Sequence, residues 1–224
     1  MKGNIFRAVI LGAPGSGKGT ISSRILKTFD MKHLSSGDIL RGHILNKTDL
    51  GEKAKDFIDK GQLVPDSVMV DLIMHEIKQL SEVNWLLDGF PRTKVQAEEL
   101  HKKTVINAAL NLAVPFDVII KRIQERWIHP ASGRVYNISF APPKISGKDD
   151  VTGEDLVRRS DDEPEAVAKR LQVYASTINP VLDFYRERGV LKDFHGKTSD
   201  DIWPQVLVYM SQYLKPKEHF TEVV

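Results

Sequence analysis

A glycine-rich stretch with one lysine follows the first apolar run of this chain. Residues 12–20 read G-A-P-G-S-G-K-G-T and match the pattern G-x-x-x-x-G-K. Glycines allow a tight loop whose N–H groups point inward, and the start of a following helix adds positive potential. We therefore expect a polyphosphate site here, with Lys18 reaching the outer phosphates. Gly19 stands where Ser or Thr commonly contacts Mg²⁺, and Thr20 follows one position later.

A carboxylate follows the second apolar strand pattern. Residues 85–93 read W-L-L-D-G-F-P-R-T, so a short strand ends at Asp88 and the chain then turns. In parallel sheets, binding and catalytic residues usually lie at the carboxyl ends of the strands. We expect Asp88 to lie near the loop and to hold Mg²⁺ through water, with a helix cap as the alternative. Arg92 can grip a phosphate with two parallel hydrogen bonds.

Several arginines stand beside turns or at the margins of long loops. Phosphoryl transfer spreads negative charge over equatorial oxygens, and planar guanidinium groups suit that charge. A single arginine of this kind is best interpreted as a solvent-exposed residue on a helix. Together with the loop and Asp88, however, the set indicates phosphoryl transfer. These arginines are Arg41, Arg92, Arg122, Arg126, Arg159 and Arg170.

Composition narrows the function classes. The 224 residues are 41% hydrophobic and 28% charged, as in a soluble globular protein, and include no cysteine. A disulfide framework and thiolate metal sites are thereby excluded. The net charge of +2 is too small to indicate a nucleic-acid partner, and no apolar run is long enough to cross a membrane. The N-terminus resembles neither a secretory signal nor a cleavable presequence, which predicts the cytosol or uncleaved import.

Apolar runs alternate with helical patterns along the chain. Strands are expected at residues 5–11, 85–87, 108–114 and 190–194. Helices are expected at residues 17–29, 67–80, 93–101, 116–127, 163–188 and 199–214. This alternation predicts an α/β fold, with a parallel sheet covered on both faces. Two segments interrupt it: a first insert (residues 35–64) with helical patterns alone, and a polar second insert (residues 125–162). Long segments of this kind are typical of binding inserts and active-site lids.

With these motifs the chain resembles the adenylate kinase family in its long-lid form, over essentially its whole length. The resemblance also rests on L-S-S-G-D-I-L-R at 34–41, R-W-I-H-P-A-S-G-R-V-Y at 126–136 and R-S-D-D at 159–162. It implies a P-loop nucleoside monophosphate kinase built as one domain. Its parts would be a CORE (1–34, 65–124, 163–224), an NMP-binding insert (35–64) and a LID (125–162). Residues 35–38 and 126–129 look most like the mitochondrial matrix branch, which uses GTP.

The resemblance also implies roles for individual residues. The donor triphosphate would lie on Gly15, Ser16, Gly17, Lys18, Gly19, Thr20, Arg122, Arg126, Tyr136, Asn137 and Ser199. AMP would lie on Ser36, Arg41, Gln62, Leu63, Val64, Gly89, Arg92, Gln96, Arg159 and Arg170. The side-chain amide of Gln96 can donate to and accept from the adenine edge. The catalytic set that clamps the transferring phosphoryl group would be Lys18, Arg92, Arg126, Arg159 and Arg170.

Some members of the family bind zinc in the LID with four cysteines. The matching positions here are His129, Ser132, Asp149 and Thr152, none of which supplies a thiolate. We expect no zinc or other structural metal, and instead a hydrogen-bonded polar cluster of these four side chains.

The expected activity is that of a nucleoside-triphosphate:adenylate phosphotransferase that serves nucleotide homeostasis. Mg²⁺ would accompany the donor, which would be GTP, or ATP or ITP. We expect small-molecule nucleotides as partners, no nucleic acid or membrane, a monomer, and the mitochondrial matrix, with the cytoplasm as the alternative location.

Other functions remain open on the sequence. An ATP:AMP kinase differs only in the donor. A UMP/CMP kinase usually carries Asn after the arginine that matches Arg92, where this chain has Thr93. An inactive regulatory relative would be marked by loss of Lys18 or of an arginine. A GTPase is disfavoured because N-K-T-D at 46–49 and D-V-T-G at 150–153 do not follow buried strand patterns.

Overall fold

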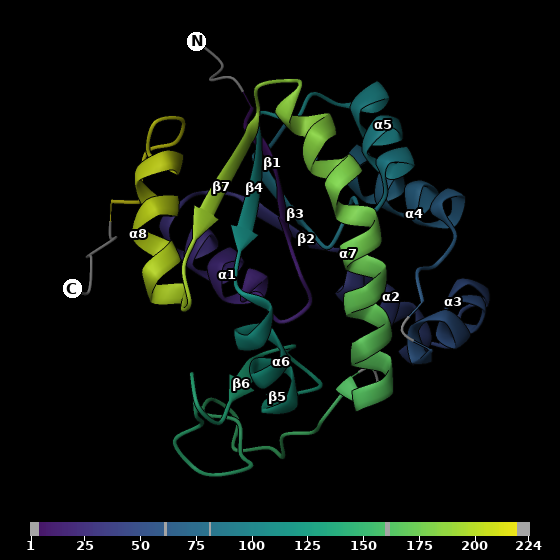
Figure 1. Cartoon of the computed structure of the whole chain (residues 1–224), viewed down its shortest axis with the longest axis vertical. Coiled ribbons are helices and arrows are strands. Elements are labelled where there is room, and N and C mark those ends of the chain that lie inside the picture. The colour runs from purple at the N-terminus through teal and green to yellow at the C-terminus, as the bar shows by residue number, and fades with distance from the viewer. Residues whose placement is uncertain (1–4, 61, 81, 160–161, 219–224) are drawn as a thin grey trace.

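A five-stranded parallel sheet forms the centre of the molecule (Figure 1). The computed structural model describes residues 5–60, 62–80, 82–159 and 162–218. The strand order is β2-β3-β1-β4-β7 and every neighbouring pair is parallel, as expected. The strands are β1 (Arg7–Gly12), β2 (Lys32–Ser35), β3 (Trp85–Asp88), β4 (Ala108–Ala113) and β7 (Leu191–His195). The apolar pattern misses β2 because Leu34 alone among its residues is buried.

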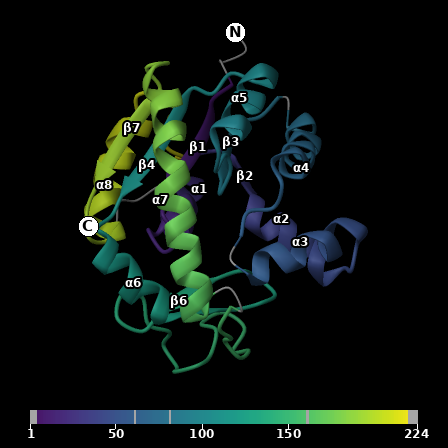
Figure 2. The same cartoon turned by 45° about the vertical axis from the view of Figure 1, so that its right-hand side comes forward.

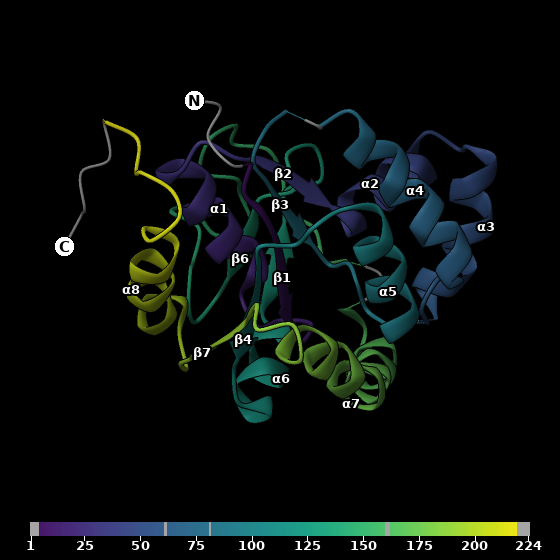
Figure 3. The same cartoon turned by 90° about the horizontal axis from the view of Figure 1, so that it is seen from above.

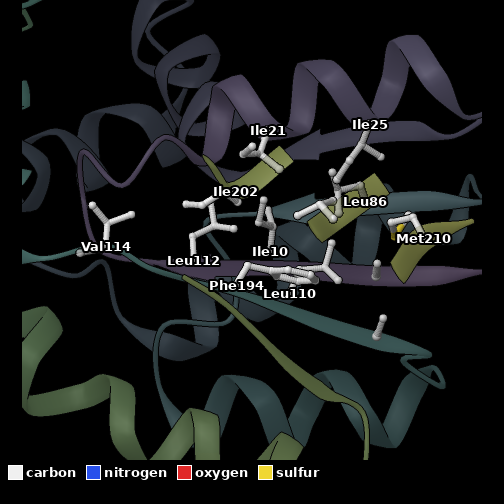
Figure 4. Close-up of a cluster of buried hydrophobic side chains, with 14 of the residues drawn as sticks. Ile10, Ile21, Ile25, Leu86, Leu110, Leu112, Val114, Phe194, Ile202 and Met210 are labelled. Atoms are coloured by element: carbon white, nitrogen blue, oxygen red, sulfur yellow. The ribbon is translucent and has the colours of Figure 1, made fainter. Parts of the chain in front are cut away.

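Helices cover both faces of the sheet (Figure 3). They are α1 (Lys18–Thr28), α2 (Ser36–Leu45), α3 (Asp49–Asp59), α4 (Asp66–Lys78), α5 (Lys94–Lys103), α6 (Phe116–Gln124), α7 (Pro164–Arg186) and α8 (Ser199–Met210). Successive strand residues point to opposite faces. Ile10 therefore packs with Ile21 of α1 and Ile202 of α8 (Figure 4), whereas Val9 packs with Val181 of α7 and its neighbours on the other face.

A polar side chain caps the start of three helices, of which α2 follows its strand directly and α5 and α8 follow theirs after short turns. Ser35 accepts a hydrogen bond from Asp38 N at the start of α2, and Thr93 accepts one from Gln96 N at the start of α5. Thr198 forms a capping box with Asp201 at the start of α8. Such caps satisfy backbone donors that a helix leaves unpaired. They hold the helix starts at the carboxyl edge of the sheet.

Both inserts lie at that same edge (Figures 1 and 2). The first insert contains α2 and α3, as its helical patterns predict. The second insert contains an antiparallel hairpin of β5 (Arg126–Ile128) and β6 (Val135–Asn137). The expected helix over 116–127 is therefore too long. It ends at Gln124 because Arg126 pairs with Asn137 across the hairpin.

The parts of the expected domain ranges at 1–4, 61, 81, 160–161 and 219–224 lie outside the described residues. Within the described ranges, no helix combines the length and apolar character needed to cross a membrane.

Candidate functional site

A cavity of about 1020 Å³ opens at the carboxyl ends of the strands. The glycine-rich loop, the end of β3, both inserts, α7 and the start of α8 all line it. The register of the sheet brings the strand ends together at this cavity, because Asp88 pairs with Ile10 of β1 on one side and with Ser35 of β2 on the other. Of the residues expected to bind nucleotides, only Ser16 and Ser36 are absent from the lining. Both are buried and have hydroxyl groups without a protein partner.

The glycine-rich loop folds around the ammonium group of Lys18. Gly15 and Gly17 adopt left-handed φ angles of 80° and 91°. Lys18 Nζ donates hydrogen bonds to Gly12 O at 2.8 Å and to Ala13 O at 2.9 Å. The ammonium group therefore lies back against the loop, at the head of α1.

Charges converge on Lys18. The pKa of Lys18 is lowered to about 8, chiefly by burial. The nearby carboxylate of Asp88 opposes this shift, and the charges of Arg92, Arg170 and Arg126 contribute to it. Three arginines from different parts of the chain thus lie near one lysine. These four positive charges produce a positive electrostatic potential that favours the binding of a polyanion.

The carboxylate of Asp88 lies beside this cationic group. It is 9% exposed, and its Oδ2 accepts a long hydrogen bond of 3.4 Å from Ser22 Oγ. His33 Nε2 is 3.9 Å from the same oxygen. A carboxylate that borders the cavity and is only loosely held by the protein fits Mg²⁺, which prefers oxygen ligands and keeps several waters.

Asp162 holds two of the expected catalytic arginines. Arg126 Nε donates to Asp162 Oδ2 at 2.7 Å, and Arg126 Nη2 pairs with Asp162 Oδ1. Arg170 Nη1 lies 3.4 Å from Oδ1. Asp162 is 3% exposed, so this carboxylate is almost entirely enclosed by its partners. Asp162 belongs to the R-S-D-D motif at 159–162, but that motif alone predicts no role for it.

The two inserts approach each other across the cavity. Arg41 of the first insert forms an ion pair with Asp38. Burial would raise the pKa of Asp38, but Arg41 outweighs it and the pKa is lowered; a hydrogen bond with Ser35 and the charge of Arg159 in the second insert contribute to the lowering. A Cβ atom on Gly133 of the second insert would lie 3.9 Å from Asp38 Oδ1. The cations expected at the acceptor phosphate thus come from both inserts.

Gly89 and Ser36 meet closely at the end of β3. Gly89 has a φ of 79°, and a Cβ atom there would lie 2.6 Å from Ser36 Oγ. Arg92 Nε donates to Gly89 O at 2.7 Å, so its guanidinium group is fixed at the same turn. From the first insert, Gln62, Leu63 and Val64 also line the cavity.

Gln96 is nearly inaccessible, at 1% exposed, and its amide has two partners in the protein. Gln96 Oε1 accepts from Arg92 N at 2.7 Å, and Nε2 donates to Asp66 Oδ1 at 2.8 Å. Thr93 Oγ1 donates to the other oxygen of Asp66 at 3.0 Å. Sequence reasoning missed Asp66, which stands 30 positions before Gln96 and carries no motif of its own.

Arg122 contacts several segments that carry residues expected to bind the donor nucleotide. Its guanidinium carbon lies 4.8 Å from the ring centroid of Phe140, and its Nη2 donates to Lys197 O at 2.8 Å. Asn137 Nδ2 donates to Arg122 O at 2.7 Å, and Asn137 Oδ1 accepts from Phe140 N. Asn137 thus joins the second insert to the end of α6. Ser199 lies at the loop, because a Cβ atom on Gly17 would be 2.9 Å from its hydroxyl.

The four positions expected to form a polar cluster come together in the second insert. His129 Nδ1 lies 2.7 Å from Ser132 Oγ, and Thr152 Oγ1 donates to Asp149 Oδ2 at 3.0 Å. His129 Nε2 lies 3.4 Å from Thr152 Oγ1, which links the two pairs.

Three further side chains complete this cluster. Arg134 donates two hydrogen bonds to the carboxylate of Asp149, at 2.8 and 2.6 Å. Tyr136 OH donates to the same carboxylate at 2.8 Å. Glu154 Oε2 lies 2.5 Å from His129 Nε2. Arg134 is the main cause that holds the pKa of Asp149 far below its ordinary value. Among the described residues, no group of three or more His, Cys, Asp or Glu side chains is arranged to hold a metal ion.

Comparison with known proteins gives one family. Residues 10–190 match the model of the family described as adenylate kinase. A Drosophila melanogaster protein named "GTP:AMP phosphotransferase, mitochondrial" is 49% identical over 207 residues, which are 92% of this chain and 96% of the relative. A Saccharomyces cerevisiae protein of the same name is 45% identical and covers 90% of each chain. A rice protein named "Adenylate kinase 4" is 43% identical over 85% of this chain and 81% of its own length.

Proposed function

This chain belongs to the adenylate kinase family, and from that premise we propose that it transfers the terminal phosphoryl group of GTP to AMP, giving GDP and ADP. The observation that carries the proposal is the convergence of Arg92, Arg126 and Arg170 on Lys18 beside the glycine-rich loop. Two relatives that match at least 90% of the chain bear the name GTP:AMP phosphotransferase, which favours GTP as the donor. ATP is expected as a weaker donor, and ITP as an alternative one.

The two nucleotides would enter from opposite sides of the cavity. The donor phosphates would lie on Gly15 to Thr20 and Lys18, and the donor base would lie against Arg122, near Tyr136, Asn137 and Ser199. AMP would lie between the first insert and the end of β3. Its phosphate would meet Arg41, Arg92 and Arg159, and its base would meet Gln96 and the backbone of residues 62–64. Ser36 and Gly89 would shape the turn beneath it.

Transfer would then need alignment and charge neutralisation rather than a protein nucleophile. The attacking atom is a phosphate oxygen of AMP, and the bond that breaks joins the γ-phosphorus of GTP to its bridging oxygen. Negative charge spreads over the equatorial oxygens of the transferring group, which Lys18, Arg92, Arg126, Arg159 and Arg170 would stabilise. Closure of the second insert would exclude water that could otherwise accept the phosphoryl group.

Mg²⁺ would be held by the donor phosphates and, through water, by Asp88. It would supply further neutralisation of charge on the β- and γ-oxygens. The loop offers no hydroxyl at the usual Mg²⁺ position, since Gly19 stands there. Asp88 is therefore expected to be the principal protein anchor for the hydrated ion. We propose no zinc site.

The domain division follows from these roles. Residues 35–64 would be the NMP-binding insert, residues 125–162 the LID, and the remainder the CORE. We propose a monomer in the mitochondrial matrix whose partners are nucleotides and which contributes to nucleotide homeostasis. The names of the two relatives that include the word mitochondrial support this location.

One coupled assay tests the proposal. GTP, ATP and ITP would each be paired with AMP, UMP, CMP and GMP, and kcat/KM measured for every pair. We expect AMP to be the preferred acceptor and GTP the better donor. A preference for ATP by tenfold or more would move the chain to the ATP-using kinases. A preference for UMP or CMP would instead move it to the UMP/CMP kinases.

A further inference from the structure

Asp66 holds the amide of Gln96 in one orientation, and this has consequences for the acceptor base. A glutamine amide has two N–H donors and two acceptor lone pairs. Here one donor is used on Asp66 Oδ1 at 2.8 Å, and one lone pair accepts from Arg92 N at 2.7 Å. One donor and one acceptor remain for a ligand. Their order is fixed by the two protein partners.

The two partners are of opposite kinds. The backbone N–H of Arg92 can only donate, and the carboxylate of Asp66 can only accept when ionised. If the amide of Gln96 turned over, its NH₂ would face the N–H of Arg92 and its oxygen would face the carboxylate. Two hydrogen bonds would be replaced by two repulsive contacts. At 1% exposure, Gln96 has almost no water to relieve them.

The fixed order of donor and acceptor on the amide of Gln96 distinguishes 6-aminopurines from 6-oxopurines. Adenine carries a donor at its 6-amino group next to an acceptor at N1, and the two ends of a glutamine amide can pair with this edge. A 6-oxopurine presents an acceptor at that position, and in hypoxanthine and guanine the neighbouring N1 carries a hydrogen. To bind those bases the amide of Gln96 would have to turn over.

We propose that Asp66 is a specificity-determining residue, which selects a 6-aminopurine nucleotide by preventing the amide of Gln96 from turning over. Asp66 does not line the cavity and acts through Gln96, so it is a positioning residue. The inference rests on the proposed function, since it takes AMP as the acceptor. Thr93 assists, because its hydroxyl holds the second oxygen of Asp66 at 3.0 Å.

The best test compares AMP with inosine 5′-monophosphate, which has nearly the same shape and the reversed hydrogen-bonding edge. Asp66→Asn keeps the size of the side chain but lets position 66 either donate or accept. Asp71→Asn on the same helix α4 is the matched control, because Asp71 is an exposed carboxylate and the charge change is equal. For each protein, kcat/KM would be measured with both acceptors at saturating GTP.

We expect the wild-type protein to prefer AMP over inosine monophosphate by on the order of 10² or more. In Asp66→Asn this preference should fall by about tenfold, the value of one hydrogen bond. The change should appear in the KM for the acceptor, with the KM for GTP unchanged. Asp71→Asn should keep the wild-type preference. Asp66→Ala should also lose preference, and it replaces Asp66→Asn if that variant does not fold.

The outcomes separate this inference from the proposed function. If the wild-type protein phosphorylates AMP and Asp66→Asn loses activity on both acceptors equally, Asp66 is merely structural and the inference is overturned. If the wild-type protein phosphorylates no AMP with any donor, the proposed function itself is wrong. A lower preference in Asp66→Asn alone, with an unchanged melting temperature, supports the inference.

Discussion

Asp162 holds the guanidinium group of Arg126 through both carboxylate oxygens, while the same carboxylate lies 3.4 Å from Arg170 Nη1. One buried carboxylate thereby sets the position of two arginines that border the cavity. Side chains of arginine lose considerable freedom when they are fixed. Because Asp162 fixes both guanidinium groups, less of their freedom has to be lost in the transition state.

Asp162→Asn should therefore reduce kcat by about 100-fold, because small errors of position at a reacting group have effects of that size. The substitution should also lower the free energy of unfolding by about 1–3 kcal/mol, since it leaves the arginines without their carboxylate. Steady-state kinetics and thermal melts would be compared with Asp183→Asn. That control removes an exposed carboxylate from the ion pair with Arg186 on α7. Equal kinetics in the two variants would contradict the role of Asp162.

Lys18→Ala and Arg126→Ala should reduce turnover far more than Arg186→Ala does. Arg126→Ala should also lower the free energy of unfolding, because it leaves the buried carboxylate of Asp162 without its main partner. An arginine that meets transition-state charge is worth roughly 10³–10⁵ in rate. Arg186→Ala is the matched control, because an exposed ion pair contributes under about 1 kcal/mol and Arg186 lies outside the cavity lining. Near-normal turnover in Arg126→Ala would remove it from the catalytic set.

The phosphate loop and the alternation of elements could be predicted because both are local in the sequence. A G-x-x-x-x-G-K pattern and runs of strand or helix periodicity need no knowledge of distant contacts. The turn after β3 was predictable for the same reason, since Asp88 follows an apolar run and precedes Gly89. The roles assigned to these residues stay predictions.

The pairings that position the site could not be predicted. Arg126 and Asp162 stand 36 positions apart, and Gln96 and Asp66 stand 30 apart. Neither pair has a period or a spacing that marks it, because each depends on how the chain folds between the two residues. The hairpin of the second insert could not be predicted either, because its local sequence carries too little signal. Its strands are three residues long, too short to carry a strand pattern.

Nucleotide binding should be accompanied by proton uptake at Lys18. The pKa of this lysine is lowered to about 8 by burial, so near pH 8 about half of the molecules carry a neutral amine. Phosphates placed against Lys18 would raise its pKa and bind the missing proton. The number of protons taken up per nucleotide bound should be about half at pH 8. It should be larger at pH 9, where more of the lysine is neutral, and close to zero at about pH 6.5, where the lysine is already charged.

Isothermal titration calorimetry in buffers of different ionisation enthalpy would measure this uptake for GDP. Lys18→Arg keeps a positive charge throughout the range and should take up no proton at this site. Uptake of the same size in Lys18→Arg would assign the proton to another group.

The stability that the polar cluster of the second insert gains from Asp149 should not depend on pH above about pH 5. Arg134 is the largest cause that lowers the pKa of Asp149, and Tyr136 and Thr152 also donate to its carboxylate. A carboxyl group whose folded pKa is lowered adds stability above its unfolded pKa of 3.8, and that stability is lost as the pH falls below about 4. The contribution of Asp149 should thus be constant between pH 5 and 8.

Asp149→Asn tests this window directly. Its Tm should lie below that of the wild-type protein by about 5 °C from pH 5 to 8, and the difference should narrow below pH 4. Asp155→Asn is the control, because Asp155 also pairs with a cation, Lys148, but its side chain is 80% exposed. A chelator should leave the wild-type Tm unchanged if, as we propose, hydrogen bonds hold the cluster without a metal. If the chelator lowers the Tm, or stoichiometric zinc is found in the purified protein, the second insert is held by metal.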